Sequence, residues 1–177
     1  NQQTTMPLWF KVLNMNKNYK LKGNCICGSV TYELSEHPLF TQACHCKDCK
    51  ILTGSSFVIN SSVIENTLSV SGTVFSTKLK AGSGLSSAAF FCKKCGVYLY
   101  TDYESAVGRI NVRTKTLKNF EMFPPQAHIF TKDKDSWINL TDISNCFEKM
   151  YDPKTVWPKN SLDRYKEYLN QKNKLIN

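Results

Sequence analysis

Cys44-His45-Cys46-Lys47-Asp48-Cys49 places three thiols within six consecutive residues, and this stretch decides how the chain is interpreted. Cys46 and Cys49 are separated by two residues, a spacing at which a tight turn aims both sulfurs at one metal ion. Two similar clusters flank it: Cys25-Ile26-Cys27 lies upstream and Cys92-Lys93-Lys94-Cys95 lies downstream. Seven of the eight cysteines therefore have spacings typical of metal ligands.

The two flanking clusters together supply four thiols, and we interpret them as one closed zinc site made of Cys25, Cys27, Cys92 and Cys95. Four thiolates fill every coordination position of a tetrahedral zinc ion, so a substrate has no position to enter. Binding of metal to such a site contributes directly to the free energy of folding. The sequence thus predicts a structural role for these four residues.

Cys44, Cys46 and Cys49 are then one ligand short of a tetrahedron. Three protein ligands with one exchangeable position is the usual arrangement of a catalytic zinc. Three residues are candidates for the fourth ligand: His45, His128 and Cys146. Ligating cysteines on both sides should aim His45 away, because neighbouring side chains tend to point apart. A lone cysteine such as Cys146 is more often a small buried apolar residue, whereas as a ligand it would close the site.

The chemistry of the second site follows from its charge. A zinc ion with three thiolates carries a net negative charge, which makes bound water a weak nucleophile. A substrate thiol suits the site better, because zinc lowers the pKa of a thiol and holds it as the thiolate. We therefore expect attack of an activated thiol on a soft electrophile. Lys47, Lys50 and local backbone N–H groups are candidates for offsetting the negative charge.

Length and composition indicate a single folded domain. The chain has 177 residues, of which 41% are hydrophobic and 12% aromatic, as expected for one globular core. No stretch approaches the ~20 apolar residues of a membrane span, and residues 1–10 lack the pattern of a secretory signal. Because metal-like cysteine spacings favour a reducing compartment, we expect a cytoplasmic protein, with the nucleus or an organelle matrix as alternatives.

The net charge of +9 is concentrated at the two ends of the chain. Residues 1–24 hold four lysines and no acidic residue, and residues 151–177 hold six basic and three acidic residues. Basic tails can bind nucleic acid through its phosphates, so a zinc-stabilised binding module for nucleic acid, chromatin or a protein partner is the alternative function. The lysines are spread among asparagines, which favours a solubilising tail over a nucleic-acid-binding one.

Hydrophobic periodicity predicts short strands separated by turns. Val30, Tyr32 and Leu34 alternate with polar residues, which is typical of a half-buried strand. Further strands are expected at 57–59, 68–70, 74–77, 98–100 and 106–112, and Trp137-Ile138 is expected to close the β-rich part. Ser161 is a candidate N-cap for a helix whose apolar residues run from 162 to 175. We expect an irregular arm over residues 1–21 and a flexible loop at Gly82–Gly84 that shapes the pocket.

Four motifs, taken in order, resemble the glutathione-dependent formaldehyde-activating enzyme family, the S-(hydroxymethyl)glutathione synthase and centromere protein V type. The motifs are Gly23–Val30, Cys44–Cys49 with Thr53-Gly54 behind it, Phe91–Gly96, and His128–Phe130 leading to Trp137. The resemblance covers residues 23 to about 147. Lys50 stands where many members of the family have arginine, and a lysine lacks the planar fork that binds a carboxylate.

The resemblance implies a mainly all-β, Mss4-like fold of small packed antiparallel sheets stabilised by zinc, with a C-terminal helix added. It implies two zinc ions per chain, a structural one at Cys25, Cys27, Cys92 and Cys95 and a catalytic one at Cys44, Cys46 and Cys49. The family reaction condenses glutathione with formaldehyde. We therefore expect a zinc-dependent carbon–sulfur lyase or synthase that acts on adducts of glutathione, or another small thiol, with formaldehyde or a related electrophile.

The resemblance to the family divides the chain into three parts. We expect a basic N-terminal arm at residues 1–22, the zinc-binding domain of the family at 23–150, and a C-terminal helical extension at 151–177.

Overall fold

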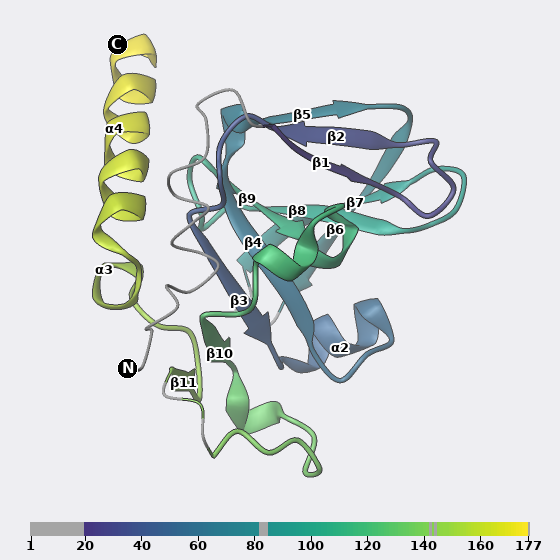
Figure 1. Cartoon of the computed structure of the whole chain (residues 1–177), viewed down its shortest axis with the longest axis vertical. Coiled ribbons are helices and arrows are strands. Elements are labelled where there is room, and N and C mark those ends of the chain that lie inside the picture. Colours follow the sequence, from purple (N-terminus) through teal and green to yellow (C-terminus); the bar gives the residue numbers. More distant parts are fainter. Residues whose placement is uncertain (1–19, 82–84, 142, 144, 177) are drawn as a thin grey trace, which may run out of the picture.

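Two β-sheets form the body of the computed structural model, which describes residues 20–81, 85–141, 143 and 145–176 (Figure 1). The smaller sheet is antiparallel, with the strand order β1 (Leu21–Asn24), β2 (Thr31–Leu34) and β5 (Leu68–Ser71). The order of the larger sheet is β11 (Cys146–Phe147), β10 (Ala127–Ile129), β3 (Phe40–Cys44), β4 (Val58–Ile64), β9 (Arg109–Arg113), β8 (Tyr98–Tyr103), β7 (Leu85–Cys92) and β6 (Val74–Ala81). The expected β-rich class with a C-terminal helix is confirmed.

Most neighbouring strands are antiparallel, but β10 runs parallel to both of its neighbours. It pairs with β3 so that Ile129 lies opposite Cys44, and with β11 so that His128 lies opposite Cys146. The segment after residue 126 therefore extends the large sheet beside the strand that carries the first thiol of the central cluster.

Residues 1–19 and 82–84 lie outside the described part of the chain, and with them most of the predicted basic arm and the predicted loop at Gly82–Gly84. The last residues of the predicted arm are not irregular, because Leu21 and Lys22 open β1.

Two clusters of buried side chains fill the space around the sheets. The first contains the predicted buried face of β2, since Val30, Tyr32 and Leu34 are all almost fully buried, and it includes Cys25 and Cys92. The second contains Cys44, Cys46 and Cys49 together with Tyr151 and Trp157 from the C-terminal part of the chain. Each set of thiols therefore belongs to a different core.

The predicted strands are present with different limits at several places. The strand expected at 57–59 extends to Ile64, because β4 pairs along its whole length with β3 and β9. The strand expected at 106–112 begins only at Arg109, after a turn in which Gly108 has a φ of 74°. The β-rich part ends later than expected, because Trp137 and Ile138 form no strand, Trp137 is exposed, and β11 follows at Cys146–Phe147.

Three α-helices complete the described chain: α2 (Lys47–Thr53), α3 (Pro153–Val156) and α4 (Lys159–Ile176). The predicted N-cap at Ser161 is wrong, since α4 starts two residues earlier and Ser161 is buried in its first turn. Short 3-10 turns occur at Glu65–Thr67, Thr114–Thr116, Phe120–Met122 and Thr131–Asp133. None of the described helices is both long and apolar enough to cross a lipid bilayer.

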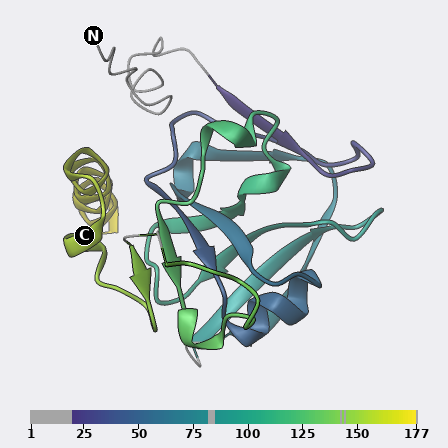
Figure 2. The same ribbon diagram turned by 60° about the horizontal axis from the view of Figure 1, so that its bottom comes forward.

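Helix α4 stands to one side of the sheets, as the views in Figures 1 and 2 both show. Its close approach depends on Gly108, because a Cβ built there would lie 2.9 Å from Tyr168 and 3.2 Å from Leu169. The Tyr168 hydroxyl donates a hydrogen bond to Glu65 at 2.6 Å, and Lys172 forms an ion pair with the same carboxylate. These contacts hold the C-terminal helix against the large sheet.

Candidate functional site

The sulfurs of Cys25, Cys27, Cys92 and Cys95, here called the four-thiol set, all lie within 4.8 Å of one another. Two turns of similar construction bring them together. In each turn the backbone carbonyl of the first cysteine accepts a hydrogen bond from the backbone N–H of a glycine. Gly28 donates to the Cys25 carbonyl at 3.1 Å, and Gly96 donates to the Cys92 carbonyl at 2.9 Å. Both glycines have a φ of 72°, which a residue with a Cβ rarely adopts.

The spacing of the four-thiol set fits a zinc ion. A tetrahedral ion with Zn–S bonds of about 2.3 Å separates its sulfurs by about 3.8 Å. The Cys25–Cys27 and Cys27–Cys92 sulfurs are 3.5 and 3.8 Å apart. The backbone N–H of Val30 also donates to the Cys25 sulfur at 3.2 Å, which stabilises a thiolate. These residues have the number, chemistry and spacing of a closed zinc site.

Cys44, Cys46 and Cys49, the three-thiol set, also lie within 4.8 Å of one another, and all three side chains are buried. Cys44 ends β3, Cys49 lies in the first turn of α2, and Cys46 is the N-cap of that helix. The Cys46 sulfur accepts a hydrogen bond from the backbone N–H of Cys49 at 3.4 Å. A strand end and a helix start thus converge on three buried sulfurs.

The three thiols differ in acidity because they hydrogen-bond one another. Bonds from the Cys44 and Cys49 thiols, with backbone N–H groups, lower the pKa of Cys46 to about 3. The same bond to Cys46, together with burial, raises the pKa of Cys44. Cys46 is therefore ionised at neutral pH, and a metal that bound all three sulfurs would displace protons from the other two.

The candidate fourth ligands do not join the three-thiol set. His45 points its Nε2 at the Nδ1 of His128, 2.9 Å away, and Phe57 packs on both imidazole rings. Burial lowers the pKa of both histidines, so the pair is neutral near pH 7. The Cys146 sulfur contacts the carbonyl of Ile143 at 3.4 Å. Within the described residues, the set of side chains that could hold a metal ion at this site consists of Cys44, Cys46 and Cys49.

The lysines expected to offset the charge of this site are directed elsewhere. Lys47 is exposed, and Lys50 forms an ion pair with Asp135 at 2.6 Å. The buried cation is Arg113, which is only 4% exposed and donates to Asn60 and to the Thr101 hydroxyl. The Cys44 thiol and, more weakly, the Arg113 charge favour ionisation of Cys49, but its hydrogen bond to Cys46 and its burial outweigh them and raise its pKa. No acidic side chain of the described chain forms an ion pair with it.

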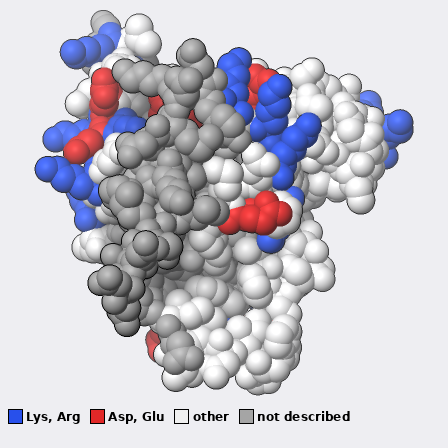
Figure 3. All heavy atoms as spheres, viewed as in Figure 1, with Lys and Arg blue, Asp and Glu red and all other residues white. Residues whose placement is uncertain are grey.

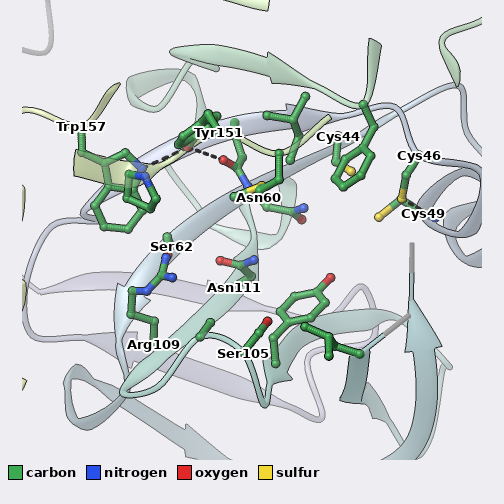
Figure 4. A pocket seen from close by; sticks show the side chains of 18 residues that line it. Cys44, Cys46, Cys49, Asn60, Ser62, Ser105, Arg109, Asn111, Tyr151 and Trp157 are labelled. Carbon is green, nitrogen blue, oxygen red and sulfur yellow. Dashed lines mark hydrogen bonds between the residues drawn. The ribbon is translucent and has the colours of Figure 1, made fainter. Parts of the chain in front are cut away.

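A cavity of about 370 Å³ opens onto the three-thiol set. Figure 4 shows the three cysteines at one end and Arg109 and Trp157 at the other. The four-thiol set does not line this cavity. Its remaining walls come from β3, β4, β8, β9 and the segment 150–157, which contribute Gln42, Asn60, Ser62, Tyr103, Ser105, Asn111, Met150, Tyr151 and Pro153, among others.

The polar floor of the cavity comes from the paired strands β4 and β9. Asn60 lies opposite Arg113, and Ser62 lies opposite Asn111, so these side chains share one face of the sheet. From the sequence, 106–112 was expected to be a buried strand, and the polar side chains that β9 presents to the cavity were not predicted. The signal was present, because arginine, asparagine and arginine recur at every second position over Arg109–Arg113, as residues on one face of a strand do.

The far wall of the cavity belongs to the C-terminal part of the chain, which the sequence analysis left without a role in the site. The Trp157 indole N–H donates to the Tyr151 hydroxyl at 3.0 Å, and that hydroxyl donates to the side chain of Gln42. The Trp157 ring also stacks on Phe40 with a centroid distance of 5.8 Å. These bonds fix Tyr151 and Trp157 against β3.

On the face shown in Figure 3 the described surface carries both basic and acidic side chains, including on the side where α4 lies in Figure 1. This helix carries Asp163 and Glu167 among its lysines, and Arg164 is paired with Glu36 at 3.1 Å. The described residues of this face therefore offer no continuous basic stripe for phosphates.

The sequence profile of a family described as glutathione-dependent formaldehyde-activating enzyme matches residues 20–133. No curated protein gives a significant sequence match. A crystal structure of a Rhodobacter sphaeroides protein is similar to this chain with a TM-score of 0.46 and 20% identity, covering 71% of this chain and 98% of that one.

Proposed function

This chain belongs to the glutathione-dependent formaldehyde-activating enzyme family, and we propose that it is a zinc-dependent carbon–sulfur lyase or synthase. Its substrates are adducts of glutathione, or of another small thiol, with formaldehyde or a related electrophile. Cys44, Cys46 and Cys49 hold the catalytic ion, and Cys25, Cys27, Cys92 and Cys95 hold a structural one. When bound by the three-thiol set, zinc supplies the stabilisation that keeps a substrate sulfur ionised.

One observation carries this proposal: three buried thiols, not four, meet at the end of a cavity of about 370 Å³. A cavity of this size suits a small molecule. The four-thiol set uses all of its sulfurs on one another and lies away from this cavity, which suits a structural role.

The residues of the chain bind and orient the reactants. In the synthetic direction the thiol sulfur attacks the carbonyl carbon, the carbon–sulfur bond forms, the carbonyl π bond breaks, and the thiol proton ends on the new hydroxyl oxygen. Tyr103 and Ser105 line the cavity and offer hydroxyls to that oxygen. Burial raises the pKa of Tyr103, so its hydroxyl stays protonated and available to donate near neutral pH. In the lyase direction the same protons and bonds move in reverse.

The test is a measurement of zinc content followed by X-ray absorption spectroscopy with and without glutathione. We expect two zinc ions per chain with an average of about 3.5 sulfurs, rising to about 4 when the thiol is added. Exchange-detected NMR should then show faster interconversion of glutathione, formaldehyde and their hydroxymethyl adduct in the presence of the enzyme.

Two results would contradict the proposal. An average of four sulfurs without added thiol would mean that a further ligand closes the second site. Full zinc occupancy with no acceleration of any thiol adduct would favour a purely structural pair of ions and the binding-module alternative.

A further inference from the structure

Arg109 is a cation of the cavity wall without an anionic partner among the described residues. Its guanidinium carbon lies 4.9 Å from the centre of the Trp157 ring and 5.1 Å from that of Tyr165. One terminal nitrogen donates a long bond of 3.4 Å to the Ser62 hydroxyl, and Nε is buried without a hydrogen-bond partner. The group is held in place by aromatic rings, and its hydrogen-bonding capacity is largely unused.

A guanidinium held in this way is suited to bind a carboxylate. Contact with aromatic faces restricts the plane of the group, and its N–H donors lie in that plane, where a carboxylate can accept two of them. The rings also reduce contact with water, which strengthens a charge-assisted hydrogen bond. The neutral Ser62 hydroxyl does not supply the missing negative charge.

The position of Arg109 relative to the three thiols would fix the orientation of a bound ligand in the cavity. Figure 4 shows Arg109, with Ser62 beside it, at the end of the cavity opposite Cys44, Cys46 and Cys49, and Asn111 and Ser105 in between. A ligand that reached both ends would carry sulfur at one end and an anion at the other. Asn111 and Ser62 offer polar groups to the atoms in the middle.

We propose that Arg109 binds a carboxylate of the thiol substrate, and that Trp157 and Tyr165 from the C-terminal part of the chain hold it in position for this. The inference rests on the proposed function, because it names the second anchor of the same ligand. It makes the substrate class a carboxylate-bearing thiol, and it gives the segment beyond the matched residues 20–133 a part in specificity.

The test measures affinities by titration calorimetry on zinc-loaded protein, with three ligands: glutathione, its glycine monoethyl ester and its diethyl ester. Wild type should bind the diethyl ester about tenfold or more weakly than glutathione, the size expected for one charge-assisted contact. The monoester shows which of the two carboxylates is bound. Arg109→Gln should reduce affinity for glutathione to that for the diester, and should leave affinity for the diester nearly unchanged.

Two further variants control the result. Arg164→Gln removes the same charge from a residue outside the cavity and should keep the wild-type preference for the acid. Arg109→Lys keeps the charge and the aliphatic stem and should retain part of that preference, whereas loss of packing alone would not distinguish lysine from glutamine. Thermal unfolding of each variant verifies that the fold is intact.

The outcomes separate this inference from the proposed function. Equal binding of glutathione and its diester by wild type, or an unchanged preference in Arg109→Gln, would overturn the carboxylate site and leave the thiol site standing. Failure of all three ligands to bind zinc-loaded wild type would overturn both.

Discussion

The four-thiol set and the three-thiol set use the same kind of side chain in opposite settings. The first lies in two turns of the sheets, where Cys27 is exposed and Cys25 and Cys92 are buried. The second is buried throughout, lies at the end of a cavity and is within electrostatic reach of the buried Arg113 guanidinium. The first satisfies its sulfurs through its own members and local backbone. The second faces a cavity whose walls come from side chains distant in sequence, on β4, β9 and the segment 150–157.

This difference shows how one chain can separate stability from reactivity. A site assembled by turns is complete once those turns form, and its free energy of metal binding contributes to folding. Where side chains distant in sequence form the cavity beside a site, substitutions among them can change which molecules bind without changing the thiols.

Cys92→Ser should have the largest effect, because it removes a fully buried sulfur from the four-thiol set and the first core. We expect a loss of about 5 kcal/mol or more in the free energy of unfolding, measured with urea, together with one zinc ion per chain. Cys146→Ser, outside both sets, should change stability by less than about 1 kcal/mol. Wild-type stability in Cys92→Ser would show that the four thiols do not support the fold.

Cys46→Ser should separate binding from folding. A serine hydroxyl can accept the Cys49 backbone N–H as an N-cap, so α2 should remain formed. We expect binding of glutathione and turnover to fall at least about 100-fold, equivalent to about 2.7 kcal/mol, with a much smaller change in thermal stability. The measurements are calorimetry, turnover and zinc content. Full activity with every thiol adduct would exclude the three-thiol set as the catalytic site.

Arg113→Gln should weaken metal retention by the three-thiol set alone, because it removes the buried positive charge beside it. We expect one of two zinc ions to be lost to a chelator about tenfold more readily, and a loss of about 2 kcal/mol in stability from the broken hydrogen bonds. Arg113→Lys, which keeps the charge, should restore part of the retention. Equal weakening of both ions would mean that Arg113 acts on the fold and not on the site.

The smallest effect concerns the attachment of α4 beside the cavity. Burial opposes ionisation of Glu65, but Lys172 and Tyr168 outweigh it and lower the pKa of this carboxyl. A lowered pKa in the folded state means that the contribution to stability is present above the unfolded pKa of about 4.3 and is lost as pH falls through the folded value.

Glu65→Gln isolates that contribution from the acid sensitivity of the thiols. Wild type should exceed the variant by about 0.5 kcal/mol near pH 7, and the difference should vanish in acid below pH 4. Thermal unfolding at several pH values measures it. A difference that stays constant into strong acid would assign the effect to packing and not to the charge.

The grouping of the thiols and the strands around them was predictable because both follow from local patterns. Spacing marked Cys25-Cys27 and Cys92-Cys95 as two ligand pairs, which the count of four ligands and the family resemblance then joined, and Gly96 marked a turn that requires positive φ. Alternation likewise identified Val30, Tyr32 and Leu34 as a buried face. These features need only neighbours along the chain.

The cavity was not predictable in the same way. Arg109 and Trp157 are far apart in sequence and meet only because α4 packs near Gly108. Helix α2 was missed because its start is capped by a sulfur, whereas the familiar N-cap residues carry oxygen. Arg113 was not predicted as a functional residue because the role of a buried arginine depends on the side chains that surround it in the folded protein.

The order of synthesis gives the far wall of the cavity one more consequence. Seven thiols and the paired strands β4 and β9 have all been made by residue 113, while Tyr151, Trp157 and Tyr165 follow later. A nascent chain folds from its N-terminal part as it emerges from the ribosome. The seven thiols can therefore come together while the cavity still lacks its aromatic side. If the proposed function holds, selectivity among thiols is the last property that the growing chain acquires.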